Sequence, residues 1–380
     1  MLGHGDRWSG EVATLLDTLD ADDGTGWRAV GPGALAGIAR ALAVARVRRE
    51  VTQSHLAAAW TRRPLASASP TQLASLLYGL AQTDALPHSV VRRAASAWAQ
   101  SDASGSTEEM EKILTPDQRA SRGADLLSAW SSEELGVACW ALAAAGHRGS
   151  PGLGALLDEL ERRCDVGGAT VVPARALRQA HQALWSRGEE DDGRGRVSER
   201  GGHGRRPRLA GAARRAWDAD LLDTKRRAGP SWYQSRVVEG LIRLGVPPRR
   251  ARSGRPSGAG WEEESVDPGY SVDVAVWFDN DGNGDRQGMT PPLAIECDGP
   301  SHELRELGES GDEANERDFG DFGAATRPTG ATRLKRALLL RAGWRVATLT
   351  HWQLDRCDDV AAVAALVRSA AEKVGVSLPG

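Results

Sequence analysis

Hydrophobic positions recur with a helical period through the first half of the chain. Four stretches begin and end with leucine seven positions apart, with small residues between. Leucines at this spacing lie on one face of a helix, and the small residues allow close packing there. A second helical pattern follows each of the first three stretches. The leucine stretches are residues 35–42, 73–80, 135–142 and 177–184, and the second patterns are at about residues 50–60, 89–98 and 153–163.

These patterns predict an array of helix pairs. Outside a longer gap in the middle, the pairs recur at about the forty residues that are usual for helical repeats. Stacked pairs of this kind form an α-solenoid, because each pair buries its apolar face against the next. Residues 105–122 interrupt the array as a polar insert. We therefore predict an N-terminal segment over residues 1–30 and a helical-repeat domain over residues 31–187.

From about residue 230 the pattern changes to a mixture of helices and strands. After a first helix, valines alternate with Asp273, Ala275 and Trp277, which is the two-residue period of a strand. An apolar strand, a second helix and a stretch rich in strand-forming residues follow. In chain order, the predicted elements are residues 231–244, 270–278, 293–298, 332–341 and 344–350. The order predicts a small mixed β-sheet flanked by helices over residues 230–378, so the fold class is α + α/β.

The apolar strand ends in acidic residues. Glu296 and Asp298 differ by two positions, so both side chains leave the same face of the strand. Burying two carboxylates side by side is costly unless a cation, a hydrogen-bonding ligand or solvent lies beside them. A Gly-Pro pair then ends the strand. We expect Asp273, Glu296 and Asp298 to converge from two neighbouring strands on one solvent-accessible pocket.

The motifs around this strand resemble those of a known family. The run IECDGPSH, which ends at His302, is followed by TRLK ending at Lys335, by GWRV starting at Gly343, and by His351-Trp352. These motifs resemble the RAP domain of organellar RNA-binding proteins, over residues 231–366. The RAP domain is similar to the PD-(D/E)XK nucleases, which implies a restriction-endonuclease-like sheet. The helical array resembles octotricopeptide repeats, which often precede a RAP domain.

The resemblance implies a protein that binds single-stranded RNA. Its function would be the processing, stabilisation or translation of chloroplast or mitochondrial transcripts, with protein partners in RNA-processing complexes. Aromatic and cationic groups suit single-stranded RNA. The residues expected to contact RNA are His302, Arg333, Lys335, Arg336, Arg345 and Trp352, whereas we expect Trp344 to be packed. Several acidic residues precede Trp27, and acidic residues are atypical of a transit peptide. No transit peptide is therefore visible in the sequence.

Two alternatives stay open. In the first, the resemblance to nucleases implies a metal-dependent endoribonuclease, in which Asp273, Glu296 and Asp298 hold Mg²⁺ for attack on the phosphodiester. Asp298 stands where the nuclease motif has a lysine, and Lys335 on the next helix is the candidate to replace it. His302 is a candidate proton donor in this reading. In the second alternative, the protein is a scaffold without RNA contact.

Composition changes this picture only slightly. The net charge of −3 does not indicate a nucleic-acid-binding protein, and only four of the 48 basic residues are lysines. Arginine suits phosphate binding and base stacking, although a GC-rich genome also raises its frequency. The four cysteines show no zinc-binding spacing, and no run of eighteen apolar residues indicates a membrane span. Glycine and arginine over residues 188–229 predict a flexible basic linker that cannot form a core.

A last motif lies between the two predicted strands. Residues 279–285 match the front half of an EF-hand calcium loop, with oxygen ligands at alternate positions. Position twelve of that loop is Thr290 instead of glutamate. The tip of a β-hairpin needs the same Asn, Asp and Gly content. We therefore interpret the segment as a hairpin tip, with calcium binding as the open alternative.

Overall fold

The computed structural model divides into two compact units. The first comprises Met1–Trp217 and Leu304–Ala331, and the second comprises Asp218–Glu303 and Thr332–Gly380. Within them, the structure describes residues 14–21, 24–63, 67–99, 127–168, 171–189, 206–227, 231–249, 251–252, 255–256, 259–265, 270–278, 291–306 and 327–379. The predicted polar insert of residues 105–122 and the predicted calcium loop of residues 279–285 lie outside the described residues.

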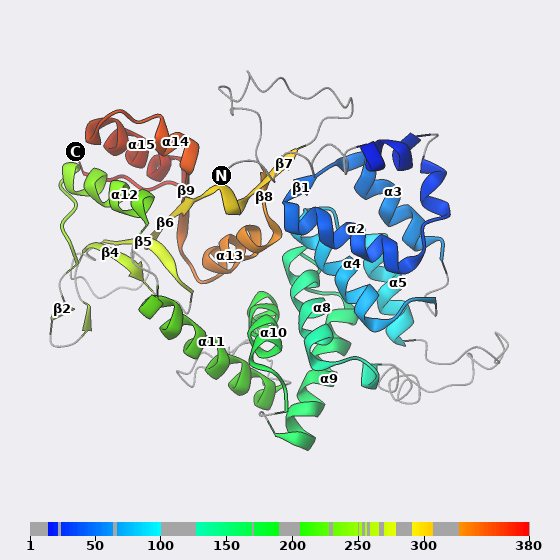
Figure 1. Cartoon of the computed structure of the whole chain (residues 1–380). Coiled ribbons are helices and arrows are strands. Elements are labelled where there is room, and N and C mark those ends of the chain that lie inside the picture. Colours follow the sequence, from blue (N-terminus) through cyan, green and yellow to red (C-terminus); the bar gives the residue numbers. More distant parts are fainter. Residues whose placement is uncertain are drawn as a thin grey trace. The chain divides into compact units, whose positions relative to one another are not determined.

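Packed helices make up most of the first unit (Figure 1). The leucine-rich helices pack in succession, α2 against α4, α4 against α8, and α8 against α10. The second helices of the pairs pack in the same way, α3 against α5 and α5 against α9. The bounds are α2 Pro32–Ala45, α3 Glu50–Thr61, α4 Pro70–Gln82, α5 His88–Ala99, α8 Ser132–Ala144, α9 Pro151–Gly167 and α10 Ala174–Arg187. The predicted mostly helical N-terminal region is confirmed.

Local sequence explains where these helices begin and how closely they pack. Capping boxes open α4 at Ser69 and α8 at Ser131, with proline at the first position of α4. Gly79 in α4 lies so close to α2 that a Cβ atom would be 2.4 Å from the Ala39 backbone. Only glycine allows that approach, so the small residues between the leucines set the spacing of the helices.

Two predicted segments differ from the structure. Residues 188–229 were expected to be flexible and without a core, but α11 (Pro207–Arg227) is a helix that buries Leu209, Ala213 and Trp217. That expectation is wrong for this part, because apolar residues four apart outweigh the glycine and arginine content. The segment Leu304–Ala331 belongs to the first unit, although it lies inside the predicted domain of residues 230–378. There β7 (Glu303–Glu306) pairs in parallel with β1 (Val47–Arg48), and β8 (Arg327–Pro328) follows β7 in the same sheet.

A four-stranded sheet forms the centre of the second unit, in the order β4-β5-β6-β9. The pairs β4–β5 and β5–β6 are antiparallel, and β6 pairs in parallel with β9. A parallel pair needs a crossover, and helix α13 connects β6 to β9. The bounds are α12 Trp232–Arg243, β4 Gly260–Ser265, β5 Val272–Trp277, β6 Leu293–Asp298, α13 Gly330–Arg341, β9 Arg345–Thr350, α14 His351–Asp355 and α15 Val360–Lys373. The short strands β2 (Ala251–Arg252) and β3 (Arg255–Pro256) form a separate antiparallel pair. The expected small mixed sheet with flanking helices is confirmed.

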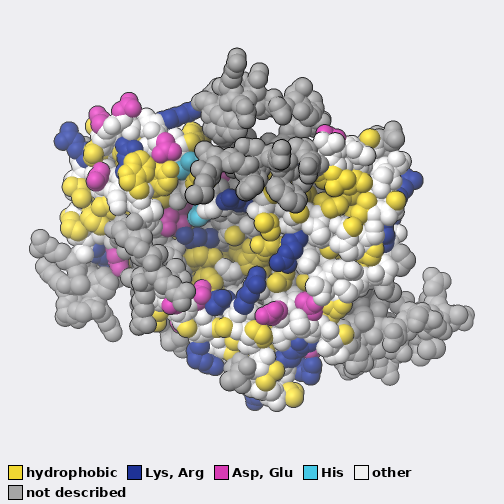
Figure 2. All heavy atoms as spheres, viewed as in Figure 1, with side chains coloured by type: hydrophobic (Ala, Val, Ile, Leu, Met, Phe, Trp, Pro, Cys, Tyr) yellow, Lys and Arg dark blue, Asp and Glu magenta, His cyan; other side chains and the backbone are white. Residues whose placement is uncertain are grey.

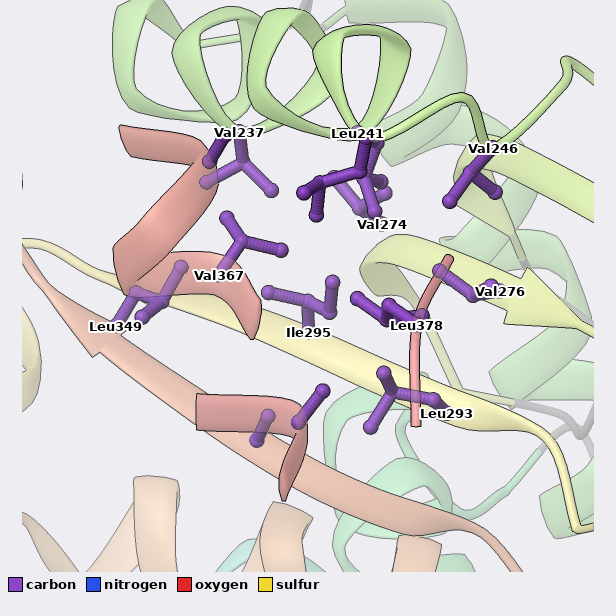
Figure 3. Close-up of a cluster of buried hydrophobic side chains, with 14 of the residues drawn as sticks. Val237, Leu241, Val246, Val274, Val276, Leu293, Ile295, Leu349, Val367 and Leu378 are labelled. Carbon is purple, nitrogen blue, oxygen red and sulfur yellow. The ribbon is translucent and has the colours of Figure 1, made fainter. Parts of the chain in front are cut away.

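One face of this sheet is apolar. Figure 3 shows Val237 and Leu241 of α12 pointing toward Ile295 of β6, with Val367 of α15 beside them. Val274 of β5 belongs to the same buried cluster. These side chains are almost completely buried, so this face is the main hydrophobic core of the unit.

The opposite face has a smaller apolar cluster at one end. Leu339 of α13 packs with Ala275, Ala294 and Trp344. Trp344 is buried and meets Trp277 edge-on, with ring centroids 4.9 Å apart, as expected of a packed residue. Among the described residues, no helix is both long and apolar enough to cross a membrane.

Candidate functional site

The register of the sheet brings two predicted acids face to face. Val274 of β5 pairs with Ile295 of β6, so the neighbouring Asp273 and Glu296 lie across from each other on the opposite face. Asp298 follows two positions later on that face, at the end of β6. We call the face that carries these three carboxylates the acid face. The three acids thus share one face of the sheet, as expected, but Glu296 and Asp298 are each only 2% exposed, so the expected solvent accessibility is not found for these two.

Glu296 is buried and paired with a lysine from α13. Its Oε2 atom contacts Nζ of Lys335, and the two side chains are 3% and 17% exposed. The second carboxylate oxygen of Glu296 is buried without a hydrogen-bond partner among the described residues. The ring of Tyr270 lies 5.8 Å from the Lys335 nitrogen. This is a buried ion pair, in which removal of either partner leaves the other charge uncompensated.

The surroundings shift the pKa values of both partners upward. Burial raises the pKa of Glu296 to about 7, against the opposing effect of Lys335 and with further increases from Asp273 and Asp298. Burial lowers the pKa of Lys335, but Glu296 and Asp273 raise it by more, so it lies above its ordinary value. At neutral pH, therefore, Lys335 stays protonated, whereas Glu296 is close to its pKa and is present in both its protonated and its ionised form. A carboxyl group of this kind can accept or donate a proton near physiological pH.

Asp298 is held by an arginine and a histidine. Arg336 of α13 contacts one of its carboxylate oxygens, and Nδ1 of His302 lies 2.9 Å from the other. The hydrogen bond from His302 to Asp298 raises the pKa of His302, although burial opposes the increase. The hydroxyl group of Thr332 donates to the carbonyl of His302 at 3.3 Å. These contacts link the end of β6 to the start of α13.

Asp273 has a backbone partner. Its carboxylate accepts a hydrogen bond from the N–H of Cys297 at 2.8 Å. The side chain thus takes the place of a strand partner where the paired register of β5 and β6 ends. Burial raises the pKa of the Cys297 thiol, and the Asp273 carboxylate adds to the increase. The thiol is therefore a packing group on the apolar face and not a reactive one.

The predicted metal site does not fit this arrangement. Three carboxylates suit Mg²⁺ as ligands, but here Glu296 is bound by Lys335, Asp298 by Arg336, and Asp273 by a backbone N–H. Within the part of the chain that the structure describes, no group of three or more His, Cys, Asp or Glu side chains is placed to hold a metal ion. As folded, Glu296 and Asp298 of the acid face are held in ion pairs and Asp273 is held by a hydrogen bond.

The residues predicted to contact RNA are placed in different surroundings. Lys335 and Arg336 are engaged by carboxylates, as described above, and Arg333 on the same helix is half-buried. Arg345, at the start of β9, is exposed. Trp352 is half-buried in α14, where the guanidinium group of Arg356 lies 5.4 Å from its ring centroid. Of these groups, Arg345 and Trp352 are outside the ion pairs of the acid face.

A second aromatic group was missed by the sequence analysis. Trp232, at the start of α12, is 58% exposed, and Arg236 lies 5.0 Å from its ring centroid. Arg236 is fixed in place because it donates to the carbonyls of Leu354 and Cys357, at 2.9 and 2.7 Å. The same spacing, tryptophan followed four positions later by arginine, occurs at Trp352 and Arg356 and would have been a signal for both pairs.

Tyr233 connects these two pairs. Its ring meets Trp232 edge-on at 5.0 Å and His351, the neighbour of Trp352, at 6.4 Å. Its hydroxyl group donates to Asp355 at 3.4 Å. We call the group of aromatic and basic side chains on α12 and α14 the aromatic–arginine surface; it consists of Trp232, Tyr233, Arg236, His351, Trp352 and Arg356.

Charged residues of both signs lie on the face of the molecule in Figure 2. On the face in Figure 2, basic side chains of the described residues are interspersed with acidic and hydrophobic ones. Such a surface favours local contacts with a ligand over long-range attraction of a polyanion.

No protein-family model matches the chain, and a search of curated proteins finds no match. The resemblance to the RAP family therefore rests on the sequence motifs alone.

Proposed function

We propose that the protein binds single-stranded RNA through its second unit. In this proposal it is a RAP-type protein of the chloroplast or mitochondrion that acts in the processing, stability or translation of organelle transcripts. The sheet is of the restriction-endonuclease-like kind, and the helix pairs form an octotricopeptide-like α-solenoid. In the central sheet and its helices, the order is helix α12, strands β4, β5 and β6, the crossover helix α13 and the parallel strand β9. This order supports the restriction-endonuclease-like assignment. The successive packing of α2, α4, α8 and α10 supports the assignment of an α-solenoid.

The observation that carries this proposal is the aromatic–arginine surface. An exposed indole ring gives a base a flat surface on which to stack, whatever the base. Arg236, held by two carbonyl groups, orients the ring of Trp232 and brings positive charge next to it. Trp352 with Arg356 repeats the arrangement on the neighbouring helix. Two such pairs provide stacking sites for an unpaired RNA strand.

The ion pairs of the acid face support binding without cleavage. A nuclease needs free carboxylates for its metal and a free cation for the phosphate. Here Lys335 neutralises Glu296, and Arg336 neutralises Asp298. The fold then serves as a rigid support for the stacking residues of α12 and α14.

The test is a binding titration of full-length protein with labelled single-stranded RNA. Because stacking on one aromatic side chain contributes about 1–3 kcal/mol, we expect Trp232→Ala and Trp352→Ala each to weaken binding about 5- to 150-fold. Ile242→Ala is a matched control, since Ile242 is on the same helix as Trp232 and is 57% exposed. Equal affinity of all three variants and the wild type would reject the proposal.

A metal-dependent endoribonuclease is the second candidate. The observation in its favour is that Asp273 and Glu296 face each other on adjacent strands, next to a buried lysine. The ion pairs would have to open before these carboxylates became free. Incubation of labelled RNA with protein and Mg²⁺ tests this: cleavage that disappears in Glu296→Gln supports the nuclease. Cleavage that persists in the variant comes from a contaminant, and intact RNA argues against the candidate.

A further inference from the structure

Two histidines from neighbouring helix pairs of the first unit lie in direct contact. His88 is the first residue of α5, and His147 lies in the turn between α8 and α9. Their Nδ1 atoms are 2.9 Å apart, and their ring centroids are 4.7 Å apart. The two residues therefore join the pair α4–α5 to the pair α8–α9. Neither histidine belongs to the site described above.

The contact made by His147 determines which of its nitrogens carries the proton. Its Nε2 atom lies 3.3 Å from the carbonyl oxygen of Leu86. A carbonyl oxygen only accepts, so Nε2 carries the proton and donates it. With its proton on Nε2, His147 directs the lone pair of Nδ1 toward His88.

This arrangement has two properties of a metal site. Two imidazole nitrogens bound to one Zn²⁺ at about 2.0–2.1 Å are about 2.9 to 3.4 Å apart, depending on the angle at the metal. The distance between the Nδ1 atoms of His88 and His147 falls at the short end of that range. In addition, metal-binding histidines usually donate the other ring N–H to a carbonyl or carboxylate, as His147 does to Leu86.

We propose that His88 and His147 form a two-histidine site for a transition-metal ion of the Zn²⁺, Ni²⁺ or Cu²⁺ class. Imidazole prefers these ions over Mg²⁺ and Ca²⁺, which take oxygen ligands. Among the described residues there is no third ligand side chain, so water completes the coordination. Nδ1 of His88 already faces His147, and because His88 is exposed, its proton can move to Nε2 through solvent while Nδ1 binds the ion. The ion would hold two helix pairs of the array together.

Calorimetric titration of metal-free, full-length protein tests the site. The four cysteines are free thiols and can bind Zn²⁺, so Ni²⁺ is the better probe. The wild type is expected to bind one equivalent of Ni²⁺. In His88→Ala and in His147→Ala, the affinity for Ni²⁺ should be lowered about tenfold or more. His351→Ala, in which a histidine packed against Tyr233 is removed, is the matched control and should keep the binding.

A second measurement separates metal binding from misfolding. Binding to the native state alone raises the unfolding temperature, so Ni²⁺ should raise that of the wild type and of His351→Ala but not those of the two other variants. The unfolding temperatures without metal show whether each variant is folded. Absence of Ni²⁺ binding in the wild type would overturn the proposal, because the histidines would then share only a hydrogen bond. Unchanged binding in either His88→Ala or His147→Ala would overturn it equally.

Discussion

The two faces of the central sheet are built on different principles. The apolar face has Val274, Ile295 and Leu349, and the helices α12 and α15 cover it with more apolar side chains. The acid face has Glu296 and Asp298 on the same strand as Ile295, and charged residues of α13 cover these acids. Burial of apolar surface stabilises the first face without directional contacts. The second is stable only while each carboxylate keeps its partner.

This difference shows which face of the sheet tolerates amino-acid substitutions and which face does not. A hydrophobic core accepts other residues of similar volume, because its contacts are not specific in direction. A buried ion pair does not, because loss of one partner leaves a charge in a medium of low polarity. The variants below remove one contact at a time from each face, in order of decreasing expected effect.

Loss of Lys335 should be the most damaging single change. In Lys335→Met, the buried carboxylate of Glu296 loses its partner, so we expect the free energy of unfolding at pH 8 to fall by about 3–5 kcal/mol. The loss should shrink as the pH falls below about 7, where Glu296 takes up a proton. Urea denaturation measures both values. Lys373→Met, at an exposed position of α15, should change stability by no more than about 0.5 kcal/mol. Equal effects of the two substitutions would mean that the ion pair contributes nothing.

A cavity on the apolar face should cost nearly as much, but without dependence on pH. Ile295 is 1% exposed, so Ile295→Ala should lower the free energy of unfolding by about 2–5 kcal/mol. The exposed Ile242 provides the matched control, in which the same substitution should cost less than about 0.5 kcal/mol. If the loss in Ile295→Ala varied with pH like that in Lys335→Met, the two faces would not be independent.

Protonation of Glu296 should make stability depend on pH. Its folded-state pKa of about 7 is above its ordinary value, so the folded chain binds the proton more tightly than the unfolded chain. This contribution is complete below about pH 4.5 and is lost as the pH rises through about 7. The total is on the order of 3 kcal/mol, because each tenfold change in proton affinity corresponds to about 1.4 kcal/mol.

Glu296→Gln isolates this effect. The variant lacks the titrating group, so the difference in stability between wild type and variant should decrease between pH 5 and pH 8. Glu239→Gln, at an exposed position of α12, is the control and should run parallel to the wild type. A constant difference for Glu296→Gln across this range would show that the pKa of Glu296 is not raised.

The smallest effect concerns His302. Its hydrogen bond to Asp298 raises its pKa and stabilises the fold, fully at low pH and less as the pH rises through the raised value. In Asp298→Asn, the pKa of His302 should fall, because the hydrogen bond to Asp298 is the largest cause of the increase and Asp273 alone then opposes the effect of burial. Titration of the imidazole signals by NMR measures the change. An unchanged pKa would show that the 2.9 Å contact does not persist in solution.

Periodicity in the sequence predicted the apolar face but not the partners on the acid face. The alternation of valines in β5 and the spacing of leucines in the helices locate both cores, since these patterns are local. Lys335 is far from Glu296 in the sequence, and their contact depends on how the crossover helix α13 crosses the sheet. No local pattern contains that information. The spacing of Trp232 and Arg236, by contrast, is local and was overlooked.

Strand β4 and helix α15 were not located from the sequence, for other reasons. Strand β4 contains Glu262 and Glu263 and lies at the edge of the sheet, where polar residues are tolerated and the alternation is weak. Helix α15 has the helical spacing of Val363, Val367 and Ala371, but it follows the last predicted strand and was not identified. Both complete the sheet unit without contributing to the acid face.

Photo-cross-linking of a uridine-substituted single-stranded RNA to the full-length protein, followed by peptide mapping, tests the account most directly. If the aromatic–arginine surface holds the RNA while the acid face stays closed by its ion pairs, the cross-linked peptides will contain Trp232 or Trp352, and the RNA will stay intact with Mg²⁺ present. Cross-links confined to the peptides of Glu296 and Lys335, together with shortened RNA, would contradict it.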